Sequence, residues 1–356
     1  VYRHTDYVSG GAGYPLSLPF IRYYDNKNVG EIDNLGGGWR HNYMISCENS
    51  TASWPALAMN SGNAASGSGN IVQGLVATLL GTGSGTTPFI LSVISIDGAS
   101  QLLTANTVTV RDGDRSYLFT QLKDGTYVSP KGVQVALAKV TDHFEMLTFD
   151  GVKYTFTNWP QKKTKIEKIE FPNGVIINFT YTLVPDQRLA TVSNNLGRSL
   201  TFNHVDTLGL LFWLSSINAG SVTLNYSVTV VQNNVHMDSA TDSMGRTTQY
   251  NYDSKHRLLG YTRPNGGGLN YSIGYNDLDQ VITRSNPASG GSGSGVKTIS
   301  SLSYADRMVT YSSPGDLITT NFNADGQPTS INVNGELTSR QYESSGRVSL
   351  ETTAIG

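Results

Sequence analysis

Apolar and polar residues alternate along most of the chain after residue 89. The segments SYLFTQL, VKYTFTNW, VIINFTYTL and VTLNYSVTVV show the pattern, because apolar or aromatic residues recur in them at alternate positions. A period of two is typical of half-buried β-strands, whose successive side chains point to opposite faces of a sheet. No helical pattern of useful length follows residue 89. The pattern therefore predicts many short antiparallel strands.

Tight turns separate these strands. Asn-Gly pairs stand between two alternating runs at residues 173–174, 265–266 and 334–335. Asn and Gly both accept positive φ, so this pair predicts a two-residue type I′ hairpin turn. Pro172 and Pro264 directly precede two of the pairs and help to end the strands before them. The segments therefore read as a series of β-hairpins.

A short motif recurs in the last third of the chain: an aromatic residue, an acidic or amide residue, a polar turn and an apolar run. It begins at Tyr252-Asp253, Tyr275-Asn276, Phe322-Asn323 and Tyr342-Glu343. Tyr252 and Tyr275 are 23 residues apart, and Phe322 and Tyr342 are 20 apart. A period near 20 is typical of stacked repeats. One hairpin cannot bury its apolar face alone, so neighbouring hairpins should pair edge to edge into one sheet.

Local amino-acid composition along the chain predicts four regions. Residues 1–50 carry bursts of aromatic residues and glycine, and residues 51–88 form a low-complexity insertion with an apolar stretch that could make a short helix. Residues 89–240 hold degenerate β-repeats. Residues 241–356 hold the clearer repeats, interrupted by a Gly/Ser loop at 289–295.

Composition and charge exclude several classes of partner. Charged residues make up 15% of the chain, and 25 basic against 27 acidic residues give a net charge of −2. A nucleic-acid-binding protein would need a basic face, so we expect no nucleic acid. No apolar run approaches the ~20 residues of a spanning helix, so we expect no membrane insertion. Cys47 is the only cysteine, which excludes a disulfide framework and favours a buried thiol.

Two groups of residues carry a resemblance to a known family. Tyr342 to Val348 has the spacing Tyr-Glu-x-x-Gly-Arg-Val, which resembles the YD repeat of RHS proteins. Residues 252–258 are a near copy, with His256 in place of the turn glycine. Near the N-terminus, Thr5-Asp6-Tyr7, the block PLSLPFIRYY at 15–24 and Gly38-Trp39-Arg40-His41-Asn42-Tyr43 look like the RHS N-terminal domain. The resemblance covers nearly the whole chain apart from the two Gly/Ser-rich stretches.

The resemblance implies an all-β fold in which antiparallel β-hairpin repeats form an extended, curled YD-repeat ribbon or partial shell. In bacterial polymorphic toxins such a shell encloses a C-terminal toxic domain. Related shells occur in insecticidal toxin complexes and in teneurin-like adhesion proteins, and members have been linked to carbohydrate binding. The resemblance also implies a secreted or cell-surface location.

Candidate functional residues follow from the motif. The aromatic candidates for ligand binding or packing are Trp39, Tyr43, Tyr252, Tyr275 and Tyr342. The repeat-turn residues are Asp253, Asn276, Asp325, Gly326, Glu343, Gly346 and Arg347. A tyrosine and a carboxylate in each repeat could stack on and hydrogen-bond a sugar. Alternatively, the tyrosine packs across strands and the acidic residue caps the turn, which better explains why the pattern recurs at every turn.

Known catalytic and metal-binding spacings are missing from the sequence. The six histidines have no His or Cys neighbours at metal-ligand spacing, and no Gly-x-Ser-x-Gly elbow with plausible partners occurs. Asp112-Gly113-Asp114 resembles the start of a calcium loop but lacks the rest, so it predicts a hairpin turn. Arg40 and His41 could form a polar site, but we favour contacts with backbone carbonyls and aromatic rings. We predict no catalytic residue, cofactor or metal.

The leading hypothesis is a non-enzymatic, secreted or surface-exposed scaffold or shell of RHS type. It would enclose or display a toxin or other cargo domain, or assemble with other copies of itself. The alternative is a carbohydrate-binding adhesin or extracellular fibre subunit with glycan partners, and a hydrolase ranks third because no constellation supports it. Open ribbons leave exposed strand edges, so we expect either edge-to-edge self-association or ends blocked by residues 1–50 and the Gly/Ser loops.

Overall fold

The structure is a computed structural model that describes ten stretches of the chain. They are residues 2–30, 32–50, 107–122, 124–157, 163–182, 187–207, 211–232, 234–264, 271–287 and 296–354. The predicted insertion at 51–88, the turn at 265–266 and the Gly/Ser loop at 289–295 lie outside the described residues. The chain divides into two compact units: one comprises Val1–Asn42 with Tyr181–Gly356, and the other comprises Tyr43–Thr180.

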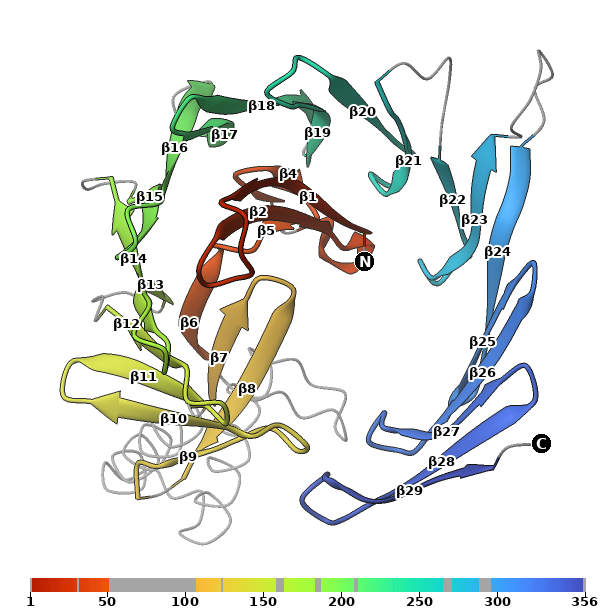
Figure 1. Ribbon diagram of the computed structural model, residues 1–356. Coiled ribbons are helices and arrows are strands. Elements are labelled where there is room, and N and C mark those ends of the chain that lie inside the picture. The colour runs from red at the N-terminus through yellow and green to blue at the C-terminus, as the bar shows by residue number, and fades with distance from the viewer. Residues whose placement is uncertain are drawn as a thin grey trace, which may run out of the picture. The chain divides into compact units, whose positions relative to one another are not determined.

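Both units are built from antiparallel strands (Figure 1). The helical structure in the described ranges is the short 3-10 turn η1 (Asn26–Asn28). No helix in those ranges is both long and apolar enough to span a membrane. The prediction of an all-β fold made of extended antiparallel hairpins is therefore confirmed.

The unit formed by residues 43–180 is a sheet of sequential hairpins. Its strands are β6 (Ile45–Ser50), β7 (Thr107–Asp112), β8 (Arg115–Gln121), β9 (Tyr127–Val128), β10 (Val135–Val140), β11 (His143–Thr148), β12 (Lys153–Phe156), β13 (Lys163–Glu170) and β14 (Ile176–Tyr181). Each of β10 to β13 pairs with the strand that follows it, and β13 also pairs with β6. The alternating pattern places Phe119, Phe156 and Ile166 in the core, where each is 0% exposed.

The other unit contains a long ribbon in which every strand pairs with the next one along the chain. Its strands are β15 (Leu189–Asn194), β16 (Ser199–Thr207), β17 (Leu211–Ala219), β18 (Val222–Val231), β19 (Asn234–Thr241), β20 (Thr247–Tyr252), β21 (Leu258–Thr262), β22 (Tyr271–Tyr275), β23 (Val281–Pro287), β24 (Val296–Ala305), β25 (Met308–Ser313), β26 (Asp316–Phe322), β27 (Pro328–Val333), β28 (Glu336–Tyr342) and β29 (Val348–Ala354). The pairing is antiparallel throughout.

The first 42 residues form a small sheet that packs on this ribbon. It consists of β1 (Tyr2–Ser9), β2 (Leu18–Tyr24) and β5 (Trp39–His41), beside the short pair β3 (Ile32–Asp33) and β4 (Gly36–Gly37). Phe20 is fully buried and its ring contacts Phe202 on β16 and Tyr226 on β18. Each large apolar side chain buried in this way contributes about 1.5–3 kcal/mol to folding.

Glycine is required where β4 meets β19. Gly36 has φ +101°, and a Cβ added there would lie 2.8 Å from the backbone oxygen of Val235. Both the left-handed backbone and the close approach exclude larger residues. Gly36 therefore allows the backbone of β4 to approach the backbone of β19 closely.

Later strands of the ribbon form a single layer with two unlike faces. The register places Leu302, Tyr311, Ile318 and Val333 in one apolar row across β24 to β27. The neighbouring row on the opposite face is Ser303, Thr310, Thr319 and Asn332. No residue of β25 to β28 is fully buried: Val333 is exposed, and Tyr311 and Ile318 are half-buried.

Two Asn-Gly turns in the described residues differ in type. Asn334 and Gly335 have φ of 54° and 101° and join β27 to β28 with a two-residue loop, so the type I′ prediction is confirmed there. The prediction is wrong at 173–174, where Gly174 has positive φ and its N–H donates to the Phe171 carbonyl at 2.9 Å. That bond closes a type I turn, whose second position suits the fixed φ of Pro172.

The turn predicted at Asp112-Gly113-Asp114 is present. Asp112 pairs with Arg115 across the β7–β8 hairpin, which leaves a two-residue loop between them. Within the described ranges, no group of three or more His, Cys, Asp or Glu side chains could hold a metal ion.

Candidate functional site at the repeat turns

The repeat turns share one backbone geometry. At 253–257 the N–H of Asp253 donates to the Arg257 carbonyl at 2.9 Å, and the N–H of His256 donates to the Asp253 carbonyl at 3.0 Å. The same two bonds recur at 242–246, 276–280, 323–327 and 343–347. This is a type I turn followed by one residue of positive φ. That residue is Gly245, His256, Asp279, Gly326 and Gly346 in the five turns.

In four of the five turns, the first residue caps the turn with its side chain; these residues are Asp242, Asp253, Asn276 and Asn323. Asp253 Oδ1 accepts the backbone N–H groups of Lys255 at 2.9 Å and Arg257 at 2.8 Å. Asn276 Oδ1 accepts those of Leu278 at 3.0 Å and Gln280 at 2.9 Å. These bonds satisfy amide groups that the bulge removes from the strand ladder.

The chemistry of the cap matches that of the fifth turn residue. Asp253 binds the Nε and Nη2 of Arg257 at 2.7 Å each, whereas the Asn276 amide donates to Gln280 Oε1 at 2.8 Å. Asp242 binds the guanidinium of Arg246 as Asp253 binds that of Arg257. The Asn323 amide donates to Gln327 Oε1 as that of Asn276 donates to Gln280. A carboxylate thus goes with a guanidinium and an amide with an amide in these four turns. Glu343, the longer variant, accepts a bond from the Ser345 hydroxyl.

The aromatic residue before the turn ties one hairpin to the preceding one. The Tyr275 hydroxyl donates to the Leu258 carbonyl at 2.8 Å, and the Tyr342 hydroxyl donates to the Pro328 carbonyl at 2.6 Å. Both acceptors are the first residue after the preceding repeat turn. Tyr304 makes the same bond to Val281 at 2.9 Å. Burial raises the pKa of Tyr275, which keeps this hydroxyl protonated as a donor.

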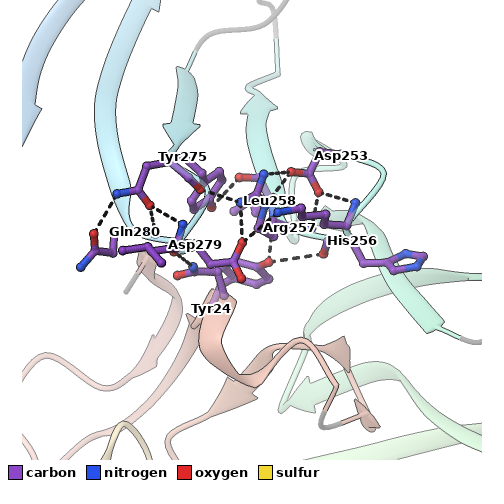
Figure 2. A network of polar contacts seen from close by, with 12 residues as sticks. Tyr24, Asp253, His256, Arg257, Leu258, Tyr275, Asp279 and Gln280 are labelled. Atoms are coloured by element: carbon purple, nitrogen blue, oxygen red, sulfur yellow. Dashed lines mark hydrogen bonds and ion pairs between the residues drawn. The ribbon is translucent and has the colours of Figure 1, made fainter.

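Arg257 joins two successive turns (Figure 2). Its Nη1 binds Asp279 Oδ1 at 2.6 Å, and its guanidinium lies 4.6 Å from the centre of the Tyr275 ring. Burial opposes its charge, but the bonds to Asp253 and Asp279 dominate and raise the pKa of Arg257. Tyr24 of the N-terminal sheet reaches the same place, where its hydroxyl accepts the Leu258 N–H at 2.8 Å.

Trp39 and Tyr252, two of the candidate residues, meet directly. Trp39 is 0% exposed, and its indole N–H donates to the Tyr252 hydroxyl at 2.8 Å. That hydroxyl donates to the Met237 carbonyl, also at 2.8 Å. Trp39 also packs edge-on against Tyr250 at 4.9 Å between ring centres. The pair therefore joins the N-terminal sheet to the repeats.

The other candidates have different surroundings. Tyr43 lies in the unit of residues 43–180, where it is buried and packs edge-on against Phe179. His41 is fully buried, and its ring contacts those of Phe20 and Phe202 at interplanar angles of 41° and 32°. Asp325 and Arg347 are exposed in their turns.

A buried ion pair at the centre of the N-terminal contact was not predicted. Arg22 is 1% exposed, and its Nε and Nη2 bind both carboxylate oxygens of Asp6. Arg22 Nη2 also donates to the Tyr250 hydroxyl at 3.0 Å, and the Tyr226 hydroxyl donates to Asp6 at 2.8 Å. Burial opposes the charge, but Asp6 raises the pKa of Arg22 well above its usual value. One sequence signal was available: an arginine inside the apolar strand LPFIRYY.

A histidine pair was also missed. His236 Nε2 lies 2.9 Å from His256 Nδ1, and the His236 ring stacks on Tyr252 at 4.1 Å. Burial, followed by the neighbouring His256, lowers the pKa of His236. The replacement of the turn glycine by His256 was the sequence signal. In the other unit, burial raises the pKa of the Cys47 thiol to about 12.

This geometry defines an antiparallel β-repeat protein in which tyrosine hydroxyls hydrogen-bond one hairpin to the preceding one. A family model described as RHS Repeat matches residues 239–267, which span β20 and the Asp242 and Asp253 turns. None of the curated proteins compared matches the chain.

Solved structures of toxin complexes share a weak likeness with the chain. The Photorhabdus luminescens Tc holotoxin pore with a mutated TccC3 is 11% identical, with a TM-score of 0.33, over 70% of this chain and 16% of that chain. TcdB2-TccC3 without its hypervariable C-terminal region is 11% identical, with a TM-score of 0.33, over 69% and 16%. TcdB2-TccC3 is 11% identical, with a TM-score of 0.31, over 70% and 17%. The chain thus spans about a sixth of the length of these chains.

Proposed function

We propose that the chain is a non-enzymatic β-repeat scaffold of RHS type that encloses or displays a polypeptide cargo. One observation carries the proposal: the repeat residues that could serve a ligand are used to hold the repeats together. The Tyr275 and Tyr342 hydroxyls bind backbone carbonyls, and Asp253 and Asn276 cap turns. The RHS Repeat match at 239–267 supports the same class.

The proposed cargo surface is the partly exposed apolar face of the later strands, defined by Leu302, Tyr311, Ile318 and Val333. Tyr311 and Ile318 lie side by side on it, while Thr310 and Thr319 occupy the opposite face. The side chains of Tyr311 and Ile318 are half-buried, and a contiguous apolar surface that stays partly exposed is typical of interaction sites. A toxin domain, another cargo domain or a further copy of the chain would suit it, and an unfolded segment would present its own apolar side chains to this face.

The proposal includes location and organisation. We place the protein outside the cell, secreted or at the cell surface, in line with its resemblance to RHS proteins. Residues 1–50 would be an RHS-type N-terminal region, and residues 241–356 the YD repeats proper. The glycan-binding alternative is disfavoured because the repeat tyrosine hydroxyls already have backbone partners.

Binding of an unfolded model polypeptide tests the cargo surface. Fluorescence anisotropy of a labelled, reduced and alkylated globular protein should show binding to the intact chain. The variant Tyr311→Ser with Ile318→Ser should bind about tenfold more weakly, a loss of about 1.4 kcal/mol. The control Thr310→Ser with Thr319→Ser changes the opposite face and should bind as the parent does. Equal binding by both folded variants, or none by the parent, would refute the cargo surface.

A further inference from the structure

A cavity of about 440 Å³ lies on one face of β11, β12 and β13, within the unit of residues 43–180. The strand register explains its position, because Glu145, Thr155 and Lys168 are neighbours across the three strands and all three line it. Paired residues on adjacent strands point to the same face of a sheet. The volume is in the range of small-molecule sites.

A β-bulge in β13 adds a carboxylate to this cavity. Thr155 pairs with Lys168 and Phe156 pairs with Ile166, so Glu167 is the extra residue between them. Bulges re-aim a side chain and are common beside functional sites. Glu167 is exposed and lines the cavity, and its carboxylate makes no ion pair or hydrogen bond with any residue that the structure describes. This carboxylate is therefore available to a ligand.

Thr155 contributes a buried hydroxyl that lacks a partner. The residue is 6% exposed, and its Oγ1 has no hydrogen-bond partner among the described residues. Buried polar groups in folded proteins are nearly always hydrogen-bonded, so an exception calls for an explanation. A ligand in the cavity that donates a hydrogen bond to Oγ1 would supply one.

The lining of the cavity is acidic. Three carboxylates against one ammonium group give it a net charge of −2 while its histidine is neutral and −1 when the histidine is protonated. These groups are Asp142, Glu145, Glu167, Lys168 and His143. The Lys168 ammonium binds Glu170, which does not line the cavity, at 3.3 Å. The excess of negative charge favours a cationic ligand.

The two carboxylates that do have partners use one oxygen each. Glu145 contacts His143 at 3.4 Å and Lys153 at 3.3 Å, both through Oε1. Asp142 contacts the other ring nitrogen of His143 at 3.0 Å through Oδ1. The second oxygen of each carboxylate lies outside these contacts, and His143 holds both groups in place beside the cavity.

We propose that this cavity binds a linear aliphatic polyamine. One ammonium group would donate hydrogen bonds to the Glu167 carboxylate and the Thr155 hydroxyl, and another to the second oxygen of Glu145 or Asp142. Within the described ranges, no group of three or more His, Cys, Asp or Glu side chains could hold a metal ion. Separated carboxylates suit a ligand with separated positive charges better than a single metal cation. The inference does not depend on the scaffold function.

Isothermal titration at low ionic strength tests the proposal, because salt screens exposed charges. Putrescine or spermidine should bind in the millimolar range or tighter, and n-butylamine, with one ammonium group, about tenfold more weakly. The uncharged 1,4-butanediol should not bind. The proposal fails if neither polyamine binds, if n-butylamine or butanediol binds equally well, or if an equal concentration of Mg²⁺ displaces putrescine.

Variants locate the binding. Glu167→Gln should weaken putrescine binding about tenfold, while Glu336→Gln, the same change at an exposed position of β28, should leave it unchanged. Thr155→Val keeps the size of the side chain and removes a hydroxyl that has no partner, so the chain should still fold. It should bind putrescine about threefold more weakly. Unchanged binding by a folded Glu167→Gln or Thr155→Val chain would place the amine elsewhere and overturn the assignment.

Discussion

At the scale of residues, a buried ion pair and its hydrogen bonds connect the N-terminal sheet to the repeats. Arg22 lies in the core with Asp6 as its counter-charge, and hydroxyl groups of Tyr226 and Tyr250 complete its bonds. Such a pair adds little relative to an apolar contact of the same size, but losing one partner leaves a buried charge alone. The pair therefore specifies how the sheet docks more than it adds stability.

Removal of the Asp6 charge should be costly. We expect Asp6→Asn to lower the free energy of unfolding by about 3–5 kcal/mol, because Arg22 stays buried without its counter-charge. The double variant Asp6→Leu with Arg22→Met should lose less than Asp6→Asn alone. Urea unfolding measures both. A loss under about 1 kcal/mol for Asp6→Asn would contradict this account of the pair.

Buried histidines should make the fold sensitive to acid. Burial, followed by the nearby His204, lowers the pKa of His41 to about 3, and burial, followed by Arg188, lowers that of His204 to about 4. Unfolded histidine has a pKa of about 6.5, so the unfolded chain takes up protons first as the pH falls. The stability is therefore fully present above about pH 6.5 and is lost progressively below it.

For His41, which is fully buried, the loss between pH 7 and pH 5 should be about 2 kcal/mol. His204 is partly exposed and should add less. Thermal unfolding at the two pH values measures the loss, and His41→Phe should show a pH dependence smaller by that amount. An identical pH dependence in parent and variant would show that His41 does not titrate as described.

At the scale of elements, the period of two predicted the strands, but it did not predict the type of each turn or the side-chain pairs within it. Asn334-Gly335 formed the expected type I′ turn. At residues 173–174, the preceding Pro172 instead favoured a type I turn. A local pattern can carry this information, because turn type depends on adjacent residues. The repeat turns were located from sequence, but their matched Asp–Arg and Asn–Gln pairs were recognised only from the contacts.

Long-range contacts were beyond the sequence patterns. Arg22 and Tyr250 are 228 residues apart, and Trp39 and Tyr252 are 213 apart. No periodicity predicts which aromatic residue of the N-terminal region meets which repeat.

At the scale of the whole molecule, each of the two units is built from paired hairpins. In the ribbon, every hairpin depends on its neighbour for strand pairing, and tyrosine ties reinforce several of the junctions. Repeat proteins of this kind gain stability mainly from nearest-neighbour interfaces. Within the described residues, β29 pairs with β28.

The central claim is that repeat tyrosines are structural ties, and amide hydrogen exchange tests it most directly. Tyr275→Phe removes the bond to the Leu258 carbonyl while keeping the ring. It should lower the local opening free energy by about 1 kcal/mol. Exchange should therefore be faster in β21 and β22, with β27 and β28 unchanged. Tyr342→Phe should give the reverse pattern. Unchanged exchange in both variants would contradict the account.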